Sequence, residues 1–189
     1  MKNETQKETG FTLVELMITL VILVILITLA APSFVDLIRS NRIATQTNLF
    51  TTALALARSE AVSRNLSVYV CKSNTGKTCD SGANWEDGWI VFADADFDGT
   101  LDVNSEEIRI FEGLATGYTL RNASVFTNWV RYMSEGNATG TTGLPVYSNT
   151  ANTEMFRLCP DNADTTKARQ INIIPSGRVT LVEGATACP

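Results

Sequence analysis

Residues 10–32 read GFTLVELMITLVILVILITLAAP, and this stretch decides the architecture of the chain. The 21 residues from Phe11 to Ala31 are apolar, interrupted only by three threonines and Glu15. An α-helix rises about 1.5 Å per residue, so the run is roughly 32 Å long, which is enough to cross the apolar core of a bilayer. The stretch therefore predicts a helix that spans a membrane.

The small residue nearest to this segment indicates how the segment is processed. A secretory signal peptide carries a small-residue cleavage site after a shorter apolar core. Here Gly10 precedes the apolar run, so cleavage at Gly10 would leave the membrane segment on the mature protein. Residues 1–10 then form a polar leader, whose two lysines are offset by two glutamates.

Glu15 is unusual because it lies inside the apolar run. An ionised side chain in a membrane segment is costly unless it is paired. Either Glu15 lies close enough to the end of the helix to reach the lipid headgroups, or it awaits a positive partner. A new N-terminal amine on Phe11 of a neighbouring subunit would be such a partner.

Beyond Pro32 the apolar residues become restricted to one face of a helix. They recur at helical spacing at Phe50, Leu54, Ala57 and Ala61. We therefore expect one helix over 11–64 that is bent near Pro32 and stops at Asn65. The expected organisation is a leader (1–10), a transmembrane or filament-core helix (11–32), the amphipathic half of the same helix (33–64) and a globular β domain (65–189).

After Asn65 the apolar pattern shifts to a period of two, which favours β-strands. Strand-like runs follow the first strand near Val68 at Gly88–Ala93, Glu107–Phe111, Tyr118–Arg121, Trp129–Met133, Met155–Cys159, Gln170–Ile174 and Arg178–Val182. Short strands joined by polar turns favour a mostly antiparallel sheet, and with the helix an α+β fold. We expect Ser134–Thr153 to be a long surface loop with room for one short strand, and Leu144–Tyr147 is an apolar run within it.

Charge and composition exclude several classes of protein. The formal net charge is −5, from 20 acidic and 15 basic side chains, which argues against a protein that coats nucleic acid. The chain has no histidine, which excludes Ser-His-Asp and Cys-His nucleophile systems and histidine-ligated metals. It also lacks a recognisable nucleophile motif or cofactor loop, so we expect a structural protein and not an enzyme.

Gly10 followed by FTLVEL resembles the cleavage and methylation site of type IV pilins and of the related type II secretion pseudopilins. The resemblance implies that a prepilin peptidase cleaves after Gly10 and that the amine of Phe11 is methylated. It also implies that Glu15 acts in assembly, that Pro32 kinks the helix, and that the helices polymerise into a filament core.

A second set of residues is similar to the GspH/FimT family of minor pilins and minor pseudopilins. These are Ala57–Ala61 (ARSEA), Cys71 and Cys79, Trp85, and GWIVFAD before a D-x-D-G turn. The resemblance implies a two-sheet β domain packed on the helix, and a low-abundance subunit that primes pilus assembly in a complex at the pilus tip. Its implied partners are other minor and major pilins.

The same resemblance implies a location as well. The precursor would cross the bacterial inner membrane once, with the β domain in the periplasm, and would then enter the filament or its tip outside the cell. An H-type minor pseudopilin of type II secretion has the same architecture and is the first alternative.

The four cysteines favour disulfides in an oxidising compartment, and they allow three pairings. We expect Cys71–Cys79, which closes a small loop, and Cys159–Cys188, which ties down the C-terminus. A zinc site would need more closely spaced ligands.

Asp94, Asp96, Asp98, Gly99 and Asp102 form the pattern D-x-D-x-D-G-x-x-D. Oxygen ligands at alternate positions around a tight glycine turn suit calcium. The EF-hand pattern requires a glutamate at position twelve, which is Ser105 here, and Glu106 is one residue later. The hypotheses are a weak structural calcium site or an aspartate-rich turn that caps backbone amides.

Gly177-Arg178-Val179-Thr180 is similar to a C-terminal motif of pilins that bind DNA during uptake. That motif has a second arginine two places after the first, where this chain has Thr180. Arg178 is expected to be a solvated strand residue, although it could form a small basic patch with Lys167 and Arg169. Nucleic acid is therefore not an expected partner, and a DNA-binding pilin is the second alternative.

Overall fold

The computed structural model describes residues 10–102, 105–122, 124–141, 155–184 and 187–188. Its first element is a single helix, α1 (Leu13–Arg64), which runs for 52 residues without interruption at Pro32. The chain divides into two compact units, Met1–Ser40 and Asn41–Pro189, and α1 contributes to both.

The C-terminal end of α1 is set by Asn65, as expected. Asn65 has a φ of 56°, in the left-handed region that asparagine tolerates better than most residues. The backbone N–H of Leu66 then donates to the carbonyl of Ala61 at 3.3 Å, the six-to-one bond of a Schellman motif. The chain therefore leaves the helix in a defined direction and enters the first strand.

The second unit contains two sheets, and every strand pairing in them is antiparallel. The first sheet has the order β3-β2-β1-β5-β6, built from β1 (Ser67–Lys72), β2 (Gly88–Asp94), β3 (Glu107–Glu112), β5 (Trp129–Tyr132) and β6 (Ala138–Gly140). The second has the order β4-β7-β8-β9, built from β4 (Thr119–Asn122), β7 (Met155–Cys159), β8 (Arg169–Ile173) and β9 (Val179–Glu183). Two short 3-10 helices, η1 (Trp85–Asp87) and η2 (Ser124–Phe126), lie in the connections.

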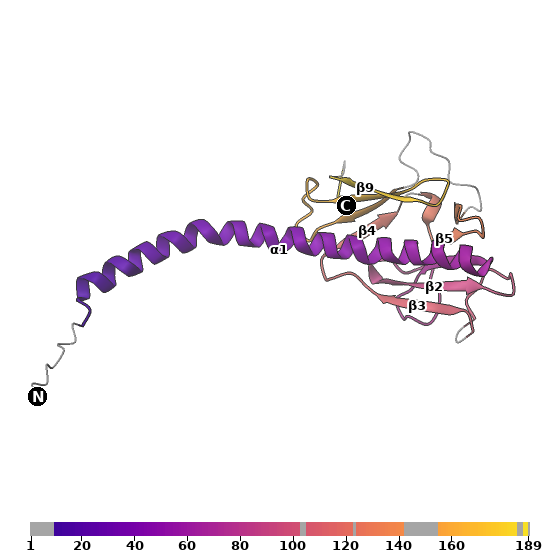
Figure 1. Ribbon diagram of the computed structural model, residues 1–189, viewed down its shortest axis with the longest axis horizontal. Helices are drawn as coiled ribbons and strands as arrows, with labels where there is room; N and C mark the ends of the chain where they lie inside the picture. The colour runs from indigo at the N-terminus through magenta and orange to yellow at the C-terminus, as the bar shows by residue number, and fades with distance from the viewer. Residues whose placement is uncertain (1–9, 103–104, 123, 142–154, 185–186, 189) are drawn as a thin grey trace, which may run out of the picture. The chain divides into compact units, whose positions relative to one another are not determined.

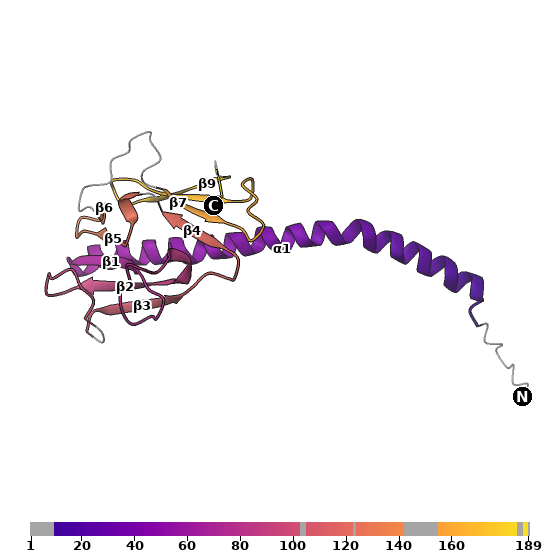
Figure 2. The ribbon, with the colours of Figure 1, turned by 180° about the vertical axis from the view of Figure 1, so that it is seen from behind.

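Figures 1 and 2 show β2 and β3 on one side of the part of α1 that belongs to the second unit, and β4 and β9 on the other side. The expected α+β fold, a long helix packed on a mostly antiparallel two-sheet domain, is confirmed. The buried face of the helix begins at Ile43, later than the expected start at Ser33. Its fully buried apolar residues are Ile43, Phe50, Ala53, Leu54, Ala57 and Ala61.

Phe50 is the centre of the core between helix and sheets. Its ring makes edge-on contacts with Trp89 of the first sheet, with Phe156 of the second, and with Trp85 of η1, at centroid distances of 5.0, 4.7 and 5.6 Å. Such edge-to-face aromatic pairs add about 0.5–1.5 kcal/mol each beyond the area that they bury. One helical side chain therefore joins both sheets.

β2 is buried along its whole length, which explains its continuous apolar sequence GWIVFAD. Trp89, Val91 and Ala93 face the core with the helix. On the other face, Ile90 and Phe92 pack in a smaller cluster with Tyr69 and Cys71 of β1. A strand with both faces covered loses the alternation of a half-buried strand.

The short strand for which the loop expected over Ser134–Thr153 has room is present. β6 lies within the stretch expected to be a loop, and it pairs with the end of β5. A Cβ at Gly140 of β6 would lie 2.1 Å from the carbonyl oxygen of Val125, so this position has no room for a side chain. The strand therefore lacks the alternating apolar residues by which a strand is recognised in a sequence. The apolar run Leu144–Tyr147 lies outside the described residues.

Candidate functional site

The expected cleavage site lies in an exposed, non-helical stretch. Gly10 and Phe11 precede the first turn of α1, and 88% of the Phe11 surface is accessible. Among the residues that the structure describes, a Cβ on Gly10 would meet nothing within 4 Å. The bond after Gly10 is therefore accessible to a peptidase without any unfolding of the helix.

Thr12 and Glu15 form a capping box at the start of α1. The backbone N–H of Glu15 donates to Oγ1 of Thr12 at 3.2 Å, and the backbone N–H of Thr12 donates to Oε2 of Glu15 at 3.1 Å. The Thr12 hydroxyl also donates to the same Oε2 at 3.0 Å. These bonds satisfy backbone donors that have no partner inside the helix. They also hold the Glu15 carboxylate close to Phe11.

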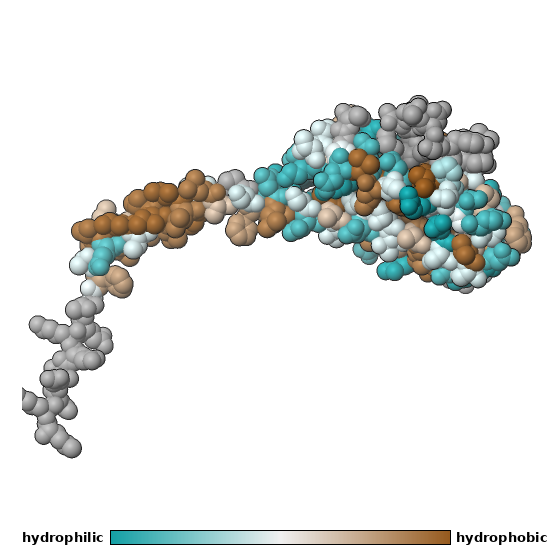
Figure 3. Space-filling model, turned by 45° about the horizontal axis from the view of Figure 1, so that its top comes forward, coloured by the Kyte–Doolittle hydropathy of each residue, from teal (hydrophilic) through white to brown (hydrophobic). Residues whose placement is uncertain are grey.

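From Leu13 to Ile38 the side chains described for the first unit are exposed, and most of them are apolar. Figure 3 shows a largely brown surface on the N-terminal part of the helix, with some teal and white near its start. By length and composition, α1 is able to cross a membrane. An apolar surface of this extent is unstable in water, so it requires lipid or other helices to cover it.

Both expected disulfides are present. Cys71 of β1 is bonded to Cys79, with Cα atoms 5.5 Å apart, and Cys159 of β7 is bonded to Cys188, with Cα atoms 5.8 Å apart. Arg157 strengthens the second connection because its guanidinium donates to the carbonyl of Ala187 at 3.2 Å. The C-terminal segment is thus fixed to the second sheet.

The acidic loop between β2 and β3 does not gather the four aspartates that the sequence pattern favours. The structure brings Asp94 and Asp96 together with Glu106, with one carboxylate oxygen from each within 4.8 Å of the others. Asp98 instead accepts hydrogen bonds from the hydroxyl and the backbone N–H of Thr100, both at 2.7 Å, and these bonds lower the pKa of the exposed Asp98 carboxyl. Asp102 uses its backbone N–H to bond Glu106.

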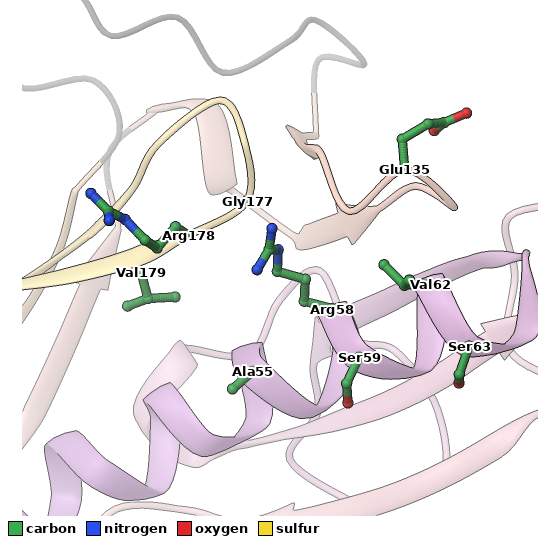
Figure 4. Close-up of a pocket in the computed structure, with 9 residues that line it drawn as sticks. All are labelled: Ala55, Arg58, Ser59, Val62, Ser63, Glu135, Gly177, Arg178 and Val179. Carbon is green, nitrogen blue, oxygen red and sulfur yellow. The ribbon is translucent and has the colours of Figure 1, made fainter.

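Arg178 lines a groove of about 740 Å³ beside the C-terminal part of α1. Figure 4 shows Arg58 on the helix and Arg178 on the β8–β9 hairpin, with Glu135 across the groove. Nε of Arg58 donates to the backbone oxygen of Gly136 at 3.1 Å, so this arginine forms a contact within the fold.

Gly177 explains how the hairpin reaches this junction. A Cβ on Gly177 would lie 2.0 Å from the backbone oxygen of Gly136, and the φ of Gly177 is +76°. Only glycine fits both the conformation and the space. The turn between β8 and β9 therefore packs directly on the turn between β5 and β6, and Arg58 bonds to the same oxygen.

The structure does not form the small basic patch considered from the sequence. Arg169 pairs with Glu183 at 3.1 Å, at the end of the β8–β9 hairpin opposite the turn that precedes Arg178. The N–H of Ile174 bonds the carbonyl of Arg178, and Ile174 lies five residue steps after Arg169, which amounts to roughly 16 Å at about 3.3 Å per residue. Arg178 and Arg169 therefore do not present a joint phosphate-binding surface.

The capping box has a local signal in the sequence, in contrast to the contact between the two turns. Thr12-Leu13-Val14-Glu15 is the S/T-x-x-E pattern of a helix start. The junction of Gly177 with Gly136 depends on a contact between distant parts of the chain, which no local pattern encodes. Glu106 lies in the same loop as Asp94 and Asp96, one residue beyond the position at which the EF-hand pattern requires a glutamate.

Comparison with known proteins agrees with these features. A family model described as type II transport protein GspH matches residues 46–177, and a model of the prokaryotic N-terminal methylation motif matches residues 5–31. A search of curated proteins gives no match.

Among solved structures, the type IV minor pilin FimU of Pseudomonas aeruginosa strain PAO1 is similar, with a TM-score of 0.55 and 18% identity over 79% of this chain and 96% of that one. The minor pseudopilin EpsH of the Vibrio cholerae type 2 secretion system gives a TM-score of 0.47 and 14% identity over 75% of this chain and 97% of that one. Because the GspH model covers more than half of the sequence and the methylation motif precedes it, the chain belongs to the GspH family of pilin-like proteins.

Proposed function

We propose that the chain is a minor type IV pilin of the FimU kind, a structural subunit that primes pilus assembly from a minor-pilin complex at the pilus tip. One observation carries this proposal: a helical surface that is apolar and exposed from Leu13 to Ile38 has a carboxylate in its first turn and an accessible glycine bond before it. Lipid covers such a surface before assembly, and the helices of other pilins cover it afterwards.

The proposed mechanism is physical and involves no catalysis by this chain. The leader holds the precursor as a single-pass protein of the inner membrane, with the β domain in the periplasm. A prepilin peptidase cleaves after Gly10, and the new amine of Phe11 becomes methylated. The subunit then leaves the lipid for the filament, where its apolar helix packs against neighbouring helices.

Glu15 sets the axial register in this mechanism. Both hydrogen bonds that it accepts in the capping box use Oε2, so within the described residues Oε1 is left for a cation. The amine of Phe11 on an adjoining subunit is a suitable cation, because attraction between unit charges is several-fold stronger at low dielectric than in water. An unpaired buried charge is costly, so the pair favours one alignment of the helices.

A minor pseudopilin of type II secretion is the second candidate, and the name of the matching family model favours it. The architecture of the chain suits both systems. The DNA-binding alternative has less support, because Arg169 is paired with Glu183 at the far end of the hairpin from Arg178.

A clean deletion in the host bacterium tests the proposal, scored for surface pili, for type II secretion of a reporter enzyme and for DNA uptake. Loss of pili with intact secretion, restored by the wild-type gene, is the expected result. Intact pili with lost secretion would place the protein in the pseudopilus. If only DNA uptake failed, the assignment to assembly would be wrong.

A further inference from the structure

The loop between β2 and β3 carries a group of acidic side chains that the proposed assembly role does not use. We propose that Asp94, Asp96 and Glu106 bind a calcium ion that fixes this loop. A carboxylate oxygen of each lies within 4.8 Å of the other two. Asp94 is the last residue of β2, and Glu106 directly precedes β3, so the ion would join the ends of two paired strands.

Asp94 provides the observation that points to a ligand. Its side chain is only 4% exposed, and its buried Oδ1 has no hydrogen-bond partner within the described part of the chain. A buried carboxylate oxygen without a donor carries a large desolvation cost. One carboxylate oxygen of Asp94 lies within 4.8 Å of oxygens from Asp96 and Glu106, so a cation held among the three would compensate the buried charge of this carboxylate.

Glu106 is a preorganised second ligand. It is 5% exposed, and its two oxygens accept the backbone N–H groups of Ala95 at 2.6 Å and of Asp102 at 3.0 Å. An ionised carboxylate has about four acceptor positions, so these bonds orient the group and leave positions for a metal. Asp96, which is exposed, accepts one bond from the backbone N–H of Asp98 at 3.2 Å and completes the set.

The local charge also favours a cation. No lysine or arginine occurs between Lys77 and Arg109, a stretch that includes the whole loop. Three carboxylates at this separation repel one another unless a cation lies between them. Elsewhere in the fold an acidic side chain forms an ion pair with an arginine, as Glu183 does with Arg169. The contacts described for Asp94, Asp96 and Glu106 include no such ion pair.

The donor set selects calcium. All three ligands offer oxygen, the chain has no histidine, and its four cysteines are disulfide-bonded, so the nitrogen and sulfur ligands typical of zinc sites are missing. Calcium accepts six to eight oxygens in flexible geometry and takes the remainder from water and backbone carbonyls, whereas magnesium requires a near-ideal octahedron. The bound ion would also fix the turn that presents Phe97, whose ring is 74% exposed.

The test is calcium titration of the detergent-purified full chain after treatment with EDTA, followed by calorimetry and by the thermal midpoint of the β domain. We expect a Kd on the order of 0.1–1 mM, as in extracellular calcium modules, and a higher midpoint with calcium than with magnesium. No binding up to about 10 mM, or an equal shift with both ions, would overturn the proposal.

A pair of loop variants makes the test specific. Asp96→Asn removes an exposed ligand and is expected to weaken calcium binding about tenfold, which corresponds to about 1.4 kcal/mol. Asp98→Asn, two residues away and engaged with Thr100, is the matched control and is expected to bind within about threefold of the wild type. Equal losses in the two variants would overturn the assignment of ligands.

Asp94→Asn separates metal binding from a purely structural role. It removes one of three repelling charges, so we expect the midpoint in EDTA to be unchanged or higher and the calcium-dependent shift to vanish. A lower midpoint in EDTA that calcium still raises would show that Asp94 supports the fold and not the ion.

Discussion

Oε2 of Glu15 lies 3.1 Å from the backbone nitrogen of Thr12, so the acidic residue expected to pair between subunits also closes the first turn of its own helix. The two roles need different properties of the side chain. Capping needs an acceptor at this position, which glutamine also supplies, whereas pairing with an amine needs negative charge. Variants of Glu15 and Thr12 therefore separate the two roles.

Glu15→Gln is expected to keep the helix start but to reduce incorporation into sheared filaments by about tenfold or more, because an unpaired buried amine costs several kcal/mol. Thr12→Val removes the capping hydroxyl and keeps the charge, so we expect a loss of about 1 kcal/mol in helix stability and near-normal incorporation. Immunoblots of sheared filament and inner-membrane fractions measure both effects.

Membrane levels are the control for these variants, since insertion depends on the apolar run and not on Glu15. Normal incorporation of Glu15→Gln together with a defect in Thr12→Val would refute charge pairing and leave capping as the role of the first turn.

Phe50→Ala is expected to destabilise the β domain by about 3–5 kcal/mol, the usual cost of deleting a buried aromatic ring. The loss is larger than for a ring at the edge of the core, because Phe50 touches Trp89 and Phe156 on different sheets. Tryptophan fluorescence during denaturant unfolding of the detergent-purified chain measures it.

The matched control for Phe50 is Phe97→Ala, which removes the same group from an exposed position and is expected to change stability by less than about 0.5 kcal/mol. Similar costs at the two positions would mean that Phe50 does not join the sheets in solution.

Local patterns predict most of the fold. The apolar run before Pro32 and the helical spacing around Phe50 predict α1, and Asn65 ends it, because each signal arises within a few residues. β2 was predicted from its apolar run for the same reason. The position of β6 within the expected loop was not predictable, because Gly140 and its neighbours pair through the backbone without an apolar pattern.

The candidate sites were less predictable because they depend on partners distant in the chain. The spacing of aspartates favours Asp98 and Asp102, but in the structure the Asp98 carboxylate bonds to Thr100, and the group of close carboxylates is Asp94, Asp96 and Glu106. The strand register also places Arg169 and Arg178 at opposite ends of a hairpin, which the order of residues in the sequence does not show. Register is a tertiary property that composition does not specify.

Gly177→Ala tests the junction of the two turns. At the φ of +76° of Gly177, an alanine lowers the free energy of unfolding by about 1–2 kcal/mol. The alanine Cβ would also overlap the Gly136 oxygen. Gly184→Ala is the control, because Gly184 has a φ of +81° and its Cβ would lie no closer than 3.7 Å to any atom of the described part of the chain. We expect Gly177→Ala to cost about 2 kcal/mol more than Gly184→Ala in the free energy of unfolding. Equal costs would mean that the turns do not touch.

The buried phenol of Tyr132 makes the free energy of unfolding depend on pH in the alkaline range. Burial raises the pKa of its phenol above the ordinary value of 10, an effect that the charge of Arg58 opposes only in part. The folded state thus keeps a proton that the unfolded state loses above pH 10. Stability is unaffected by this group below pH 10 and falls as the pH rises further, by up to about 1.4 kcal/mol per pH unit.

Tyr132→Phe should remove this alkaline loss. Since the buried Oη of Tyr132 has no hydrogen-bond partner within the described residues, the variant should also gain about 1 kcal/mol at neutral pH. Tyr69→Phe is the control, because its hydroxyl accepts a bond from Arg131 at 3.4 Å and its removal should bring no gain. Denaturant unfolding at pH 7 and above pH 10 checks both variants. A loss of stability in Tyr132→Phe at pH 7 would reveal a partner for the hydroxyl and remove the basis of the prediction.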